Sequence, residues 1–300
     1  MGRPNCLLPA ILLVWPIASP ALRAETLWEK FSGEKALAHV ERLVNLGPRP
    51  AGSEALEKSR GYIIDQLTSF GWTVNRQRFS ASTPRGAITF VNLIATFPSR
   101  DTASSNSFLL CSHYDTKTFD TFTFVGANDG GSSTGLLIEM ARVLATSQPL
   151  AAQTELVFLD GEEAFEQFTE SDGLYGSRHF ADDLRNSGKA KRLRGGILFD
   201  MVGDRSLTVT LPPDSPPNLA SNLFAAAETL RVREHFTYFD RQITDDHTPL
   251  NKIGIPVIDV IDFDYPSWHT AEDTLDKISA ESLRIVGQVA VYDLSQLELR

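Results

Sequence analysis

From residue 108 onward the chain alternates short apolar runs with amphipathic helical patterns. Parallel neighbouring strands need a long crossover between them, usually a helix, so this alternation predicts a mostly parallel α/β sheet with helices on both faces. The expected strands are 108–112, 155–159, 195–200, 207–211 and 256–261. The expected helices are 133–146, 176–185, 219–231, 248–253 and 280–297.

The part of the chain before residue 98 has a different pattern. Residues 25–46 show apolar side chains at helical spacing, and the Gly47 to Pro50 segment ends this run. Ser53 is placed to cap a second helix that ends at Phe70. Two alternating segments, 72–79 and 87–97, flank a turn and predict a pair of antiparallel strands.

The first residues resemble a secretory signal peptide. Arg3 precedes an apolar run over 7–18, and small residues offer cleavage after Ala21 or Ala24. A membrane anchor is the alternative, but the run is too short to cross a bilayer and contains two prolines. We therefore expect residues 1–24 to be removed on export to the periplasm or the outside, without stable membrane insertion afterwards.

Charge and cysteine content exclude some classes of partner and site. The formal net charge of −10 argues against nucleic acid or anionic lipid as a partner. Cys6 lies in the expected leader, so the mature chain keeps Cys111 alone and forms no intrachain disulfide. Cys111 lies in an apolar run, which favours a buried strand residue over a nucleophile.

Two adjacent carboxylates, Glu162 and Glu163, follow the expected strand 155–159 just after Gly161. Ligand sites of open α/β sheets lie beyond the carboxyl ends of the strands. Two like charges at a partly buried position repel each other, and a metal ion between them would relieve this repulsion. One carboxylate could then bind the metal while the other carries protons. Taken alone, a solvated pair in a loop is the commoner case.

Other acids and histidines also follow the expected strands. Their convergence at one edge of a sheet is hard to explain as a set of helix caps, and nitrogen and oxygen ligands suit a catalytic zinc ion with an open position. These residues are His113, Asp115, Asp129, Glu162, Glu163, Asp200, Asp245, Asp246, His247 and His269.

The same residues resemble, in type and order, the motifs of M28-type zinc aminopeptidases and their relatives, the glutaminyl-peptide cyclotransferases. The resemblance covers nearly everything from Gly47 to Ile278 and rests on His113-Tyr114-Asp115, Gly126-Ala127-Asn128-Asp129, Glu162-Glu163, Asp200 and Trp268-His269-Thr270. It implies a single catalytic α/β domain over 25–300 with a central mixed sheet flanked by helices. It also implies one zinc ion held by Asp129, Glu163 and His269, with Glu162 shuttling protons.

Within this family, several motifs look more like the cyclotransferases. These are the 160–165 run, the 172–179 segment, Asp245 in its acid-histidine motif and Trp268 directly before the ligand histidine. Other positions depart from that branch. Phe168 stands where the cyclotransferases tend to carry a tryptophan, Asp259 stands where animal members have a histidine, and 271–277 looks more like the peptidases.

The expected reaction is therefore conversion of the N-terminal glutamine of peptides and proteins to pyroglutamate, with release of ammonia. Glu162 would move the proton, while Asp200 and Asp245 would share a proton and orient the reacting groups. Trp268, Phe168 and Tyr265 would form an apolar slot for the side chain. For Phe168 and Tyr265, plain core packing is an equally good interpretation.

Two alternatives remain open on the sequence. An M28-type aminopeptidase would add a second zinc ion on His113 and Asp200, with Asp129 bridging and Glu162 activating a water molecule. A catalytically silent secreted binding domain is the other alternative, and the presence of Glu162 together with every ligand type disfavours it.

Overall fold

The structure is a computed structural model that describes residues 2, 26–98 and 107–297. The predicted signal peptide lies outside these ranges except for Gly2, so that prediction stays untested. None of the helices in the described ranges combines the length and apolar character that a bilayer crossing requires.

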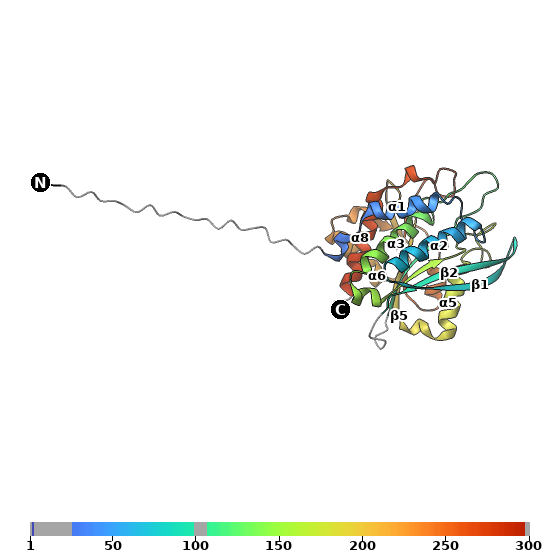
Figure 1. Cartoon of the computed structure of the whole chain (residues 1–300), viewed down its shortest axis with the longest axis horizontal. Helices are drawn as coiled ribbons and strands as arrows, with labels where there is room; N and C mark the ends of the chain where they lie inside the picture. The colour runs from blue at the N-terminus through green and yellow to red at the C-terminus, as the bar shows by residue number, and fades with distance from the viewer. Residues whose placement is uncertain (1, 3–25, 99–106, 298–300) are drawn as a thin grey trace.

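A six-stranded mixed sheet forms the centre of the molecule (Figure 1). Four neighbouring strands pair in parallel, and a long antiparallel hairpin extends one edge. In spatial order the strands are β1 Thr73–Thr83, β2 Gly86–Thr96, β4 Thr154–Leu159, β3 Ser107–His113, β5 Leu193–Asp200 and β8 Val257–Ile261. The predicted α/β class and the mostly parallel central sheet are thus confirmed.

Helices cover both faces of this sheet. One layer contains α1 Gly33–Val44, α2 Glu54–Ser69, α3 Gly131–Leu144, α6 Pro217–Thr229 and α8 Ala280–Leu297, and the other contains α5 Tyr175–Ser187 and α7 His247–Lys252 (Figure 1). Successive residues of β3 alternate between the layers: Leu110 packs with the first, whereas Leu109 and Cys111 pack with the second. Cys111 is buried, as predicted, and burial raises the pKa of its thiol.

The helical run expected over 25–46 is two elements rather than one. A 3₁₀-helix, Leu27–Lys30, is followed by α1, and the backbone between them is extended at Phe31 and Ser32. The Ser32 hydroxyl accepts a hydrogen bond from the Lys35 amide, so a local cap restarts the helix where apolar spacing alone suggested continuity.

The strand expected over 207–211 does not join the central sheet. It is the short β6 Val209–Leu211, which pairs in parallel with β7 Phe236–Tyr238 in a separate two-stranded sheet. The strand β7 was not predicted because three residues carry no readable periodicity. Further short elements that were not predicted are α4 Gln148–Ala152 and the 3₁₀-helices Lys189–Arg192, Arg233–His235 and Leu275–Lys277.

A buried ion pair ties α2 to the end of β4. The Arg60 guanidinium lies 2.9 Å from Asp160 Oδ2 and also donates to the Tyr114 hydroxyl at 2.9 Å. The same Asp160 oxygen accepts a hydrogen bond from the Val91 amide of β2 at 2.7 Å. Asp160 directly precedes Gly161 and the two glutamates, so this network fixes where that loop leaves the sheet.

Replacing Arg60 by Met should lower the free energy of unfolding by about 3–5 kcal/mol at a pH well above 7, because it leaves the buried Asp160 carboxylate without its partner. Burial and the charge of Asp115 already raise the pKa of Asp160 to about 7, and removing the guanidinium raises this pKa further. Because the unfolded chains titrate alike, the loss should stay nearly constant below pH 7 and grow as the pH rises above about 7, where Asp160 ionises in the wild type but stays protonated in the variant. Denaturant unfolding at several pH values measures it.

Arg76→Met is the matched control. Arg76 is half exposed and lies 3.3 Å from Glu57, so its removal should cost less than about 1 kcal/mol. Equal losses for the two variants would contradict a structural role of the buried pair.

Candidate active site

Three residues predicted as metal ligands converge at the carboxyl edge of the sheet. His269 Nε2 lies 3.3 Å from Asp129 Oδ2 and 3.3 Å from Glu163 Oε1. Burial opposes a charged imidazole, but hydrogen bonds to the two carboxylates prevail and raise the pKa of His269 to about 10. The two carboxylates thus stabilise positive charge at the position where their oxygen atoms converge.

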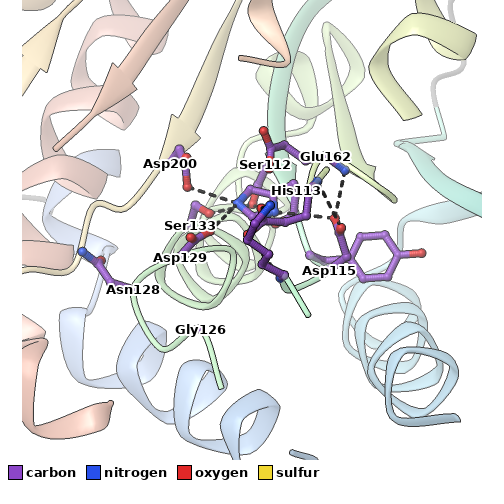
Figure 2. A network of polar contacts seen from close by, with 12 residues as sticks. Ser112, His113, Asp115, Gly126, Asn128, Asp129, Ser133, Glu162 and Asp200 are labelled. Carbon is purple, nitrogen blue, oxygen red and sulfur yellow. Dashed lines mark hydrogen bonds and ion pairs between the residues drawn. The ribbon is translucent and has the colours of Figure 1, made fainter. Parts of the chain in front are cut away.

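A second group of predicted residues shares Asp129. His113 Nε2 lies 3.2 Å from Asp129 Oδ1 and 3.2 Å from Asp200 Oδ1, and Figure 2 shows both carboxylates on the same side of the imidazole. Burial again opposes charge on this imidazole, but the charge of Asp200 and the hydrogen bonds to Asp115, Asp129 and Asp200 raise the pKa of His113 well above its usual value. The predicted ligands for a second metal ion are therefore also brought together.

The donor sets fit metal binding. In each group the ligand atoms lie within 4.8 Å of one another. Asp129 Oδ2 and Glu163 Oε2 are buried and accept no hydrogen bond from the described residues, although the Lys117 ammonium lies 3.5 Å from Glu163 Oε2, and a metal cation would satisfy both oxygens. Carboxylate oxygen and imidazole nitrogen are ligands that zinc accepts.

Glu162, the predicted proton carrier, lies in the same cavity but outside both ligand groups. Burial, and then the charge of Glu163, raise its pKa well above the usual range. Asp245 is also buried there, and burial followed by the charge of Asp200 raises its pKa. The predicted catalytic residues Glu162, Asp200 and Asp245 all line one cavity of about 880 Å³.

Two further carboxylates hold the loops that carry these side chains. Asp115 accepts hydrogen bonds from the backbone amides of Glu162, at 3.2 Å, and Glu163, at 3.4 Å (Figure 2). Asp273 accepts from the amides of Asn128, at 2.7 Å, and Asp129, at 3.1 Å. No role was predicted for Asp273, although it lies only four residues after the predicted ligand His269.

Backbone strain concentrates beside the site. His269 has a φ of +54° and Met201, next to Asp200, has a φ of +46°, in the left-handed region that side-chain-bearing residues rarely adopt. Such conformations persist only where the surrounding structure imposes them, and they cluster at functional sites.

Aromatic side chains enclose His269, the predicted metal ligand. Trp268 stacks on its imidazole with ring centroids 4.3 Å apart, and Phe119 and Phe124 approach the same ring edge-on at 5.6 and 5.9 Å. Trp268 and Phe168 line the cavity and are about two-fifths exposed, at 40% and 42%, so they are available to a ligand, as predicted.

The third predicted wall residue, Tyr265, does not line the cavity. It is buried, and its hydroxyl donates to Asp273 Oδ1 at 2.9 Å, so it supports the carboxylate that holds Asp129. Phe263, which packs against Trp268 at a tilt of 48° with ring centroids 5.0 Å apart, lines the cavity in its place.

Curated relatives share most of the chain. A glutaminyl-peptide cyclotransferase-like protein of Bos taurus is 31% identical over 259 residues, which cover 76% of this chain and 66% of that protein. A glutaminyl-peptide cyclotransferase of Dictyostelium discoideum is 28% identical over 315 residues, with coverage of 89% and 87%.

Solved structures match over a similar extent. A glutaminyl cyclase from an Acidobacteriales bacterium superposes with a TM-score of 0.84 at 34% identity, over 94% of this chain and 99% of that one. A Zn-dependent exopeptidase from Parabacteroides distasonis gives 0.80 at 27% identity, over 88% and 98%. A model of peptidase family M28 matches residues 92–293, and the chain therefore belongs to peptidase family M28.

Proposed function

We propose that the chain is a glutaminyl-peptide cyclotransferase, which converts the N-terminal glutamine of peptides to pyroglutamate and releases ammonia. One observation carries the proposal: Glu162, with its raised pKa, lies beside the ligand group of Asp129, Glu163 and His269, in a cavity walled by Trp268. The relatives and solved structures named above support the same activity.

Zinc is the metal that family membership suggests, and we propose one ion held by Asp129, Glu163 and His269. When bound there, it would supply a Lewis acid for the side-chain carbonyl of the substrate glutamine. Trp268 and Phe168 would hold the methylene groups of that side chain on the apolar side of the cavity.

In the reaction the α-amine nitrogen bonds to the side-chain amide carbon, and the bond from that carbon to its own nitrogen breaks. Glu162 takes a proton from the attacking amine and returns it to the departing nitrogen, which leaves as ammonia. A carboxyl with a raised pKa suits this exchange, because it must be both a competent base and a competent acid. Asp200 and Asp245 would share a proton and orient these groups.

We further propose that the chain is exported and that residues 25–300 form its catalytic domain. The composition of residues 1–24 supports export.

A zinc aminopeptidase is the second candidate. The group of His113, Asp129 and Asp200 favours it, because two adjacent ligand groups sharing one aspartate could hold two metal ions. The curated relatives named above are cyclotransferases, which places this candidate second.

His269→Ala should lose most of the bound zinc and the activity together, since it removes one of three ligands. Elemental analysis of purified protein and an ammonia-release assay measure the two losses. His235→Ala is the control, because His235 lies outside the cavity and its Nδ1 faces a backbone oxygen of Leu207. Full zinc content in the His269 variant would overturn the ligand assignment.

Glu162→Gln should keep its zinc and slow turnover by about 10²-fold or more, because the amide retains the shape but cannot accept the proton. Glu166→Gln makes the same chemical change in the same loop at an exposed position outside the cavity and should behave as wild type. A near-normal rate for the Glu162 variant would remove this residue from the mechanism.

Product masses separate the two candidate functions. We expect a peptide that begins with Gln to lose the mass of ammonia on incubation and a peptide that begins with Leu to stay intact. An aminopeptidase would instead release whole residues. Free Leu without any cyclised product would reject cyclisation and leave the fold and the family membership unaffected.

A further inference from the structure

The cavity extends well beyond the side chains that would hold a glutamine. Its volume of about 880 Å³ is near the upper end of the range for sites that enclose drug-sized ligands, and a single glutamine residue is much smaller. The additional lining residues come from the helices α5 and α7 and from loop residues of 169–174 and 242–244.

One face of α5 lines the cavity along its length. Arg178, Ala181, Asp182 and Arg185 all line it, and their spacing places them on a single helix face. The helix starts at the catalytic end, because the amide of its N-cap residue Leu174 donates to the Glu162 carbonyl at 2.7 Å.

The length of this wall can be compared with that of a peptide. Arg185 lies eleven positions after Leu174, and at a rise of about 1.5 Å per residue this stretch spans about 16 Å. An extended peptide advances about 3.3 Å per residue, so this wall matches about five residues.

A second helix lies against α5 and lines the same cavity. The helix α7 begins just after Asp245 and Asp246, and Thr248, Pro249, Lys252 and Ile253 line the cavity from it and from the residue that follows it. Both helices thus begin beside the catalytic carboxylates and contact each other, and together they form a groove, defined by the residues of 178–185 and 248–253 that line the cavity.

The basic residues that line the groove outnumber the acidic residues there by one when the adjoining Glu170 is counted. Arg178 donates to two backbone carbonyls, those of Leu174 and Glu170, and no ion pair joins it or Lys252 to a carboxylate in the described part of the chain. The charge of Arg185 is balanced by an ion pair with Asp182 at 2.6 Å. The exposed Glu170 is the remaining acid on this part of the lining, so one positive charge is left over.

This local charge contrasts with the formal net charge of −10 for the whole chain, which repels acidic peptides in general. We propose that the groove binds the residues that follow the N-terminal glutamine and selects substrates with an acidic side chain among the first five residues. The inference rests on the proposed cyclotransferase activity and adds a substrate class to it.

Three amidated peptides test it: Gln-Ala, Gln-Ala-Glu-Ala-Ala and Gln-Ala-Lys-Ala-Ala. At low ionic strength, kcat/KM for the Glu peptide should exceed that for the Lys peptide by about fivefold, as expected for exposed charge pairs. Added salt should reduce this ratio towards one, because it screens such pairs.

Lys252→Glu should lower the ratio below one, since it reverses a charge on the groove wall. Lys191→Glu is the matched control: it makes the same charge change at an exposed residue outside the cavity and should keep the wild-type ratio.

The outcomes separate the two proposals. Equal kcat/KM for the two charged peptides, with Gln-Ala amide still cyclised, would overturn the groove and leave the cyclotransferase activity standing. An identical ratio in wild type and Lys252→Glu would also overturn the groove. If Gln-Ala amide is not cyclised while Leu is released from a Leu peptide, the proposed activity itself fails, and the groove proposal fails with it.

Discussion

The site depends on holding several buried carboxylates close together against their mutual repulsion. The fold meets this demand with backbone amides as well as with basic side chains such as Arg60 and Lys117. Asp115 and Asp273 each accept two amide hydrogen bonds, and the amides belong to Glu162 and Glu163 in one case and to Asn128 and Asp129 in the other. A carboxylate that is anchored in this way fixes the loop while the side chains of the loop remain free to face a cation. Removing either anchor would release a metal ligand even though the anchor itself touches no metal.

A second constraint acts on His269, the predicted ligand histidine, whose backbone is strained. His269 follows Trp268 at the surface of the cavity and takes a left-handed backbone conformation, which costs about 1–3 kcal/mol where it is not favoured locally. Stacking on Trp268 and edge contacts from Phe119 and Phe124 hold the imidazole in place. The aromatic side chains therefore orient the His269 imidazole, and Trp268 also lines the cavity.

Cyclisation and hydrolysis could use almost the same residues in this fold. Both need a cation that polarises a carbonyl, and both need Glu162 as a proton carrier. They differ in the nucleophile, which is the substrate's own amine in one case and water in the other. Whether a second metal ion occupies the group of His113, Asp129 and Asp200, and whether water reaches it, would decide between cyclisation and hydrolysis. The reaction type would then depend on the state of the cavity rather than on which acidic side chains are present.

Local sequence determined the central strands and most helices, because apolar periodicity and turn residues act over a few positions. It also indicated that Asp129, Glu163 and His269 share a site, since strands joined by helical crossovers bring their carboxyl ends to one edge. Only the tertiary structure decided that Tyr265 supports Asp273 instead of lining the cavity, and that the strand near residue 209 leaves the main sheet to pair with β7. It also aligned α5 and α7 along a common groove. These outcomes rest on contacts between segments far apart in the chain, and periodicity in a sequence window carries no information about such partners.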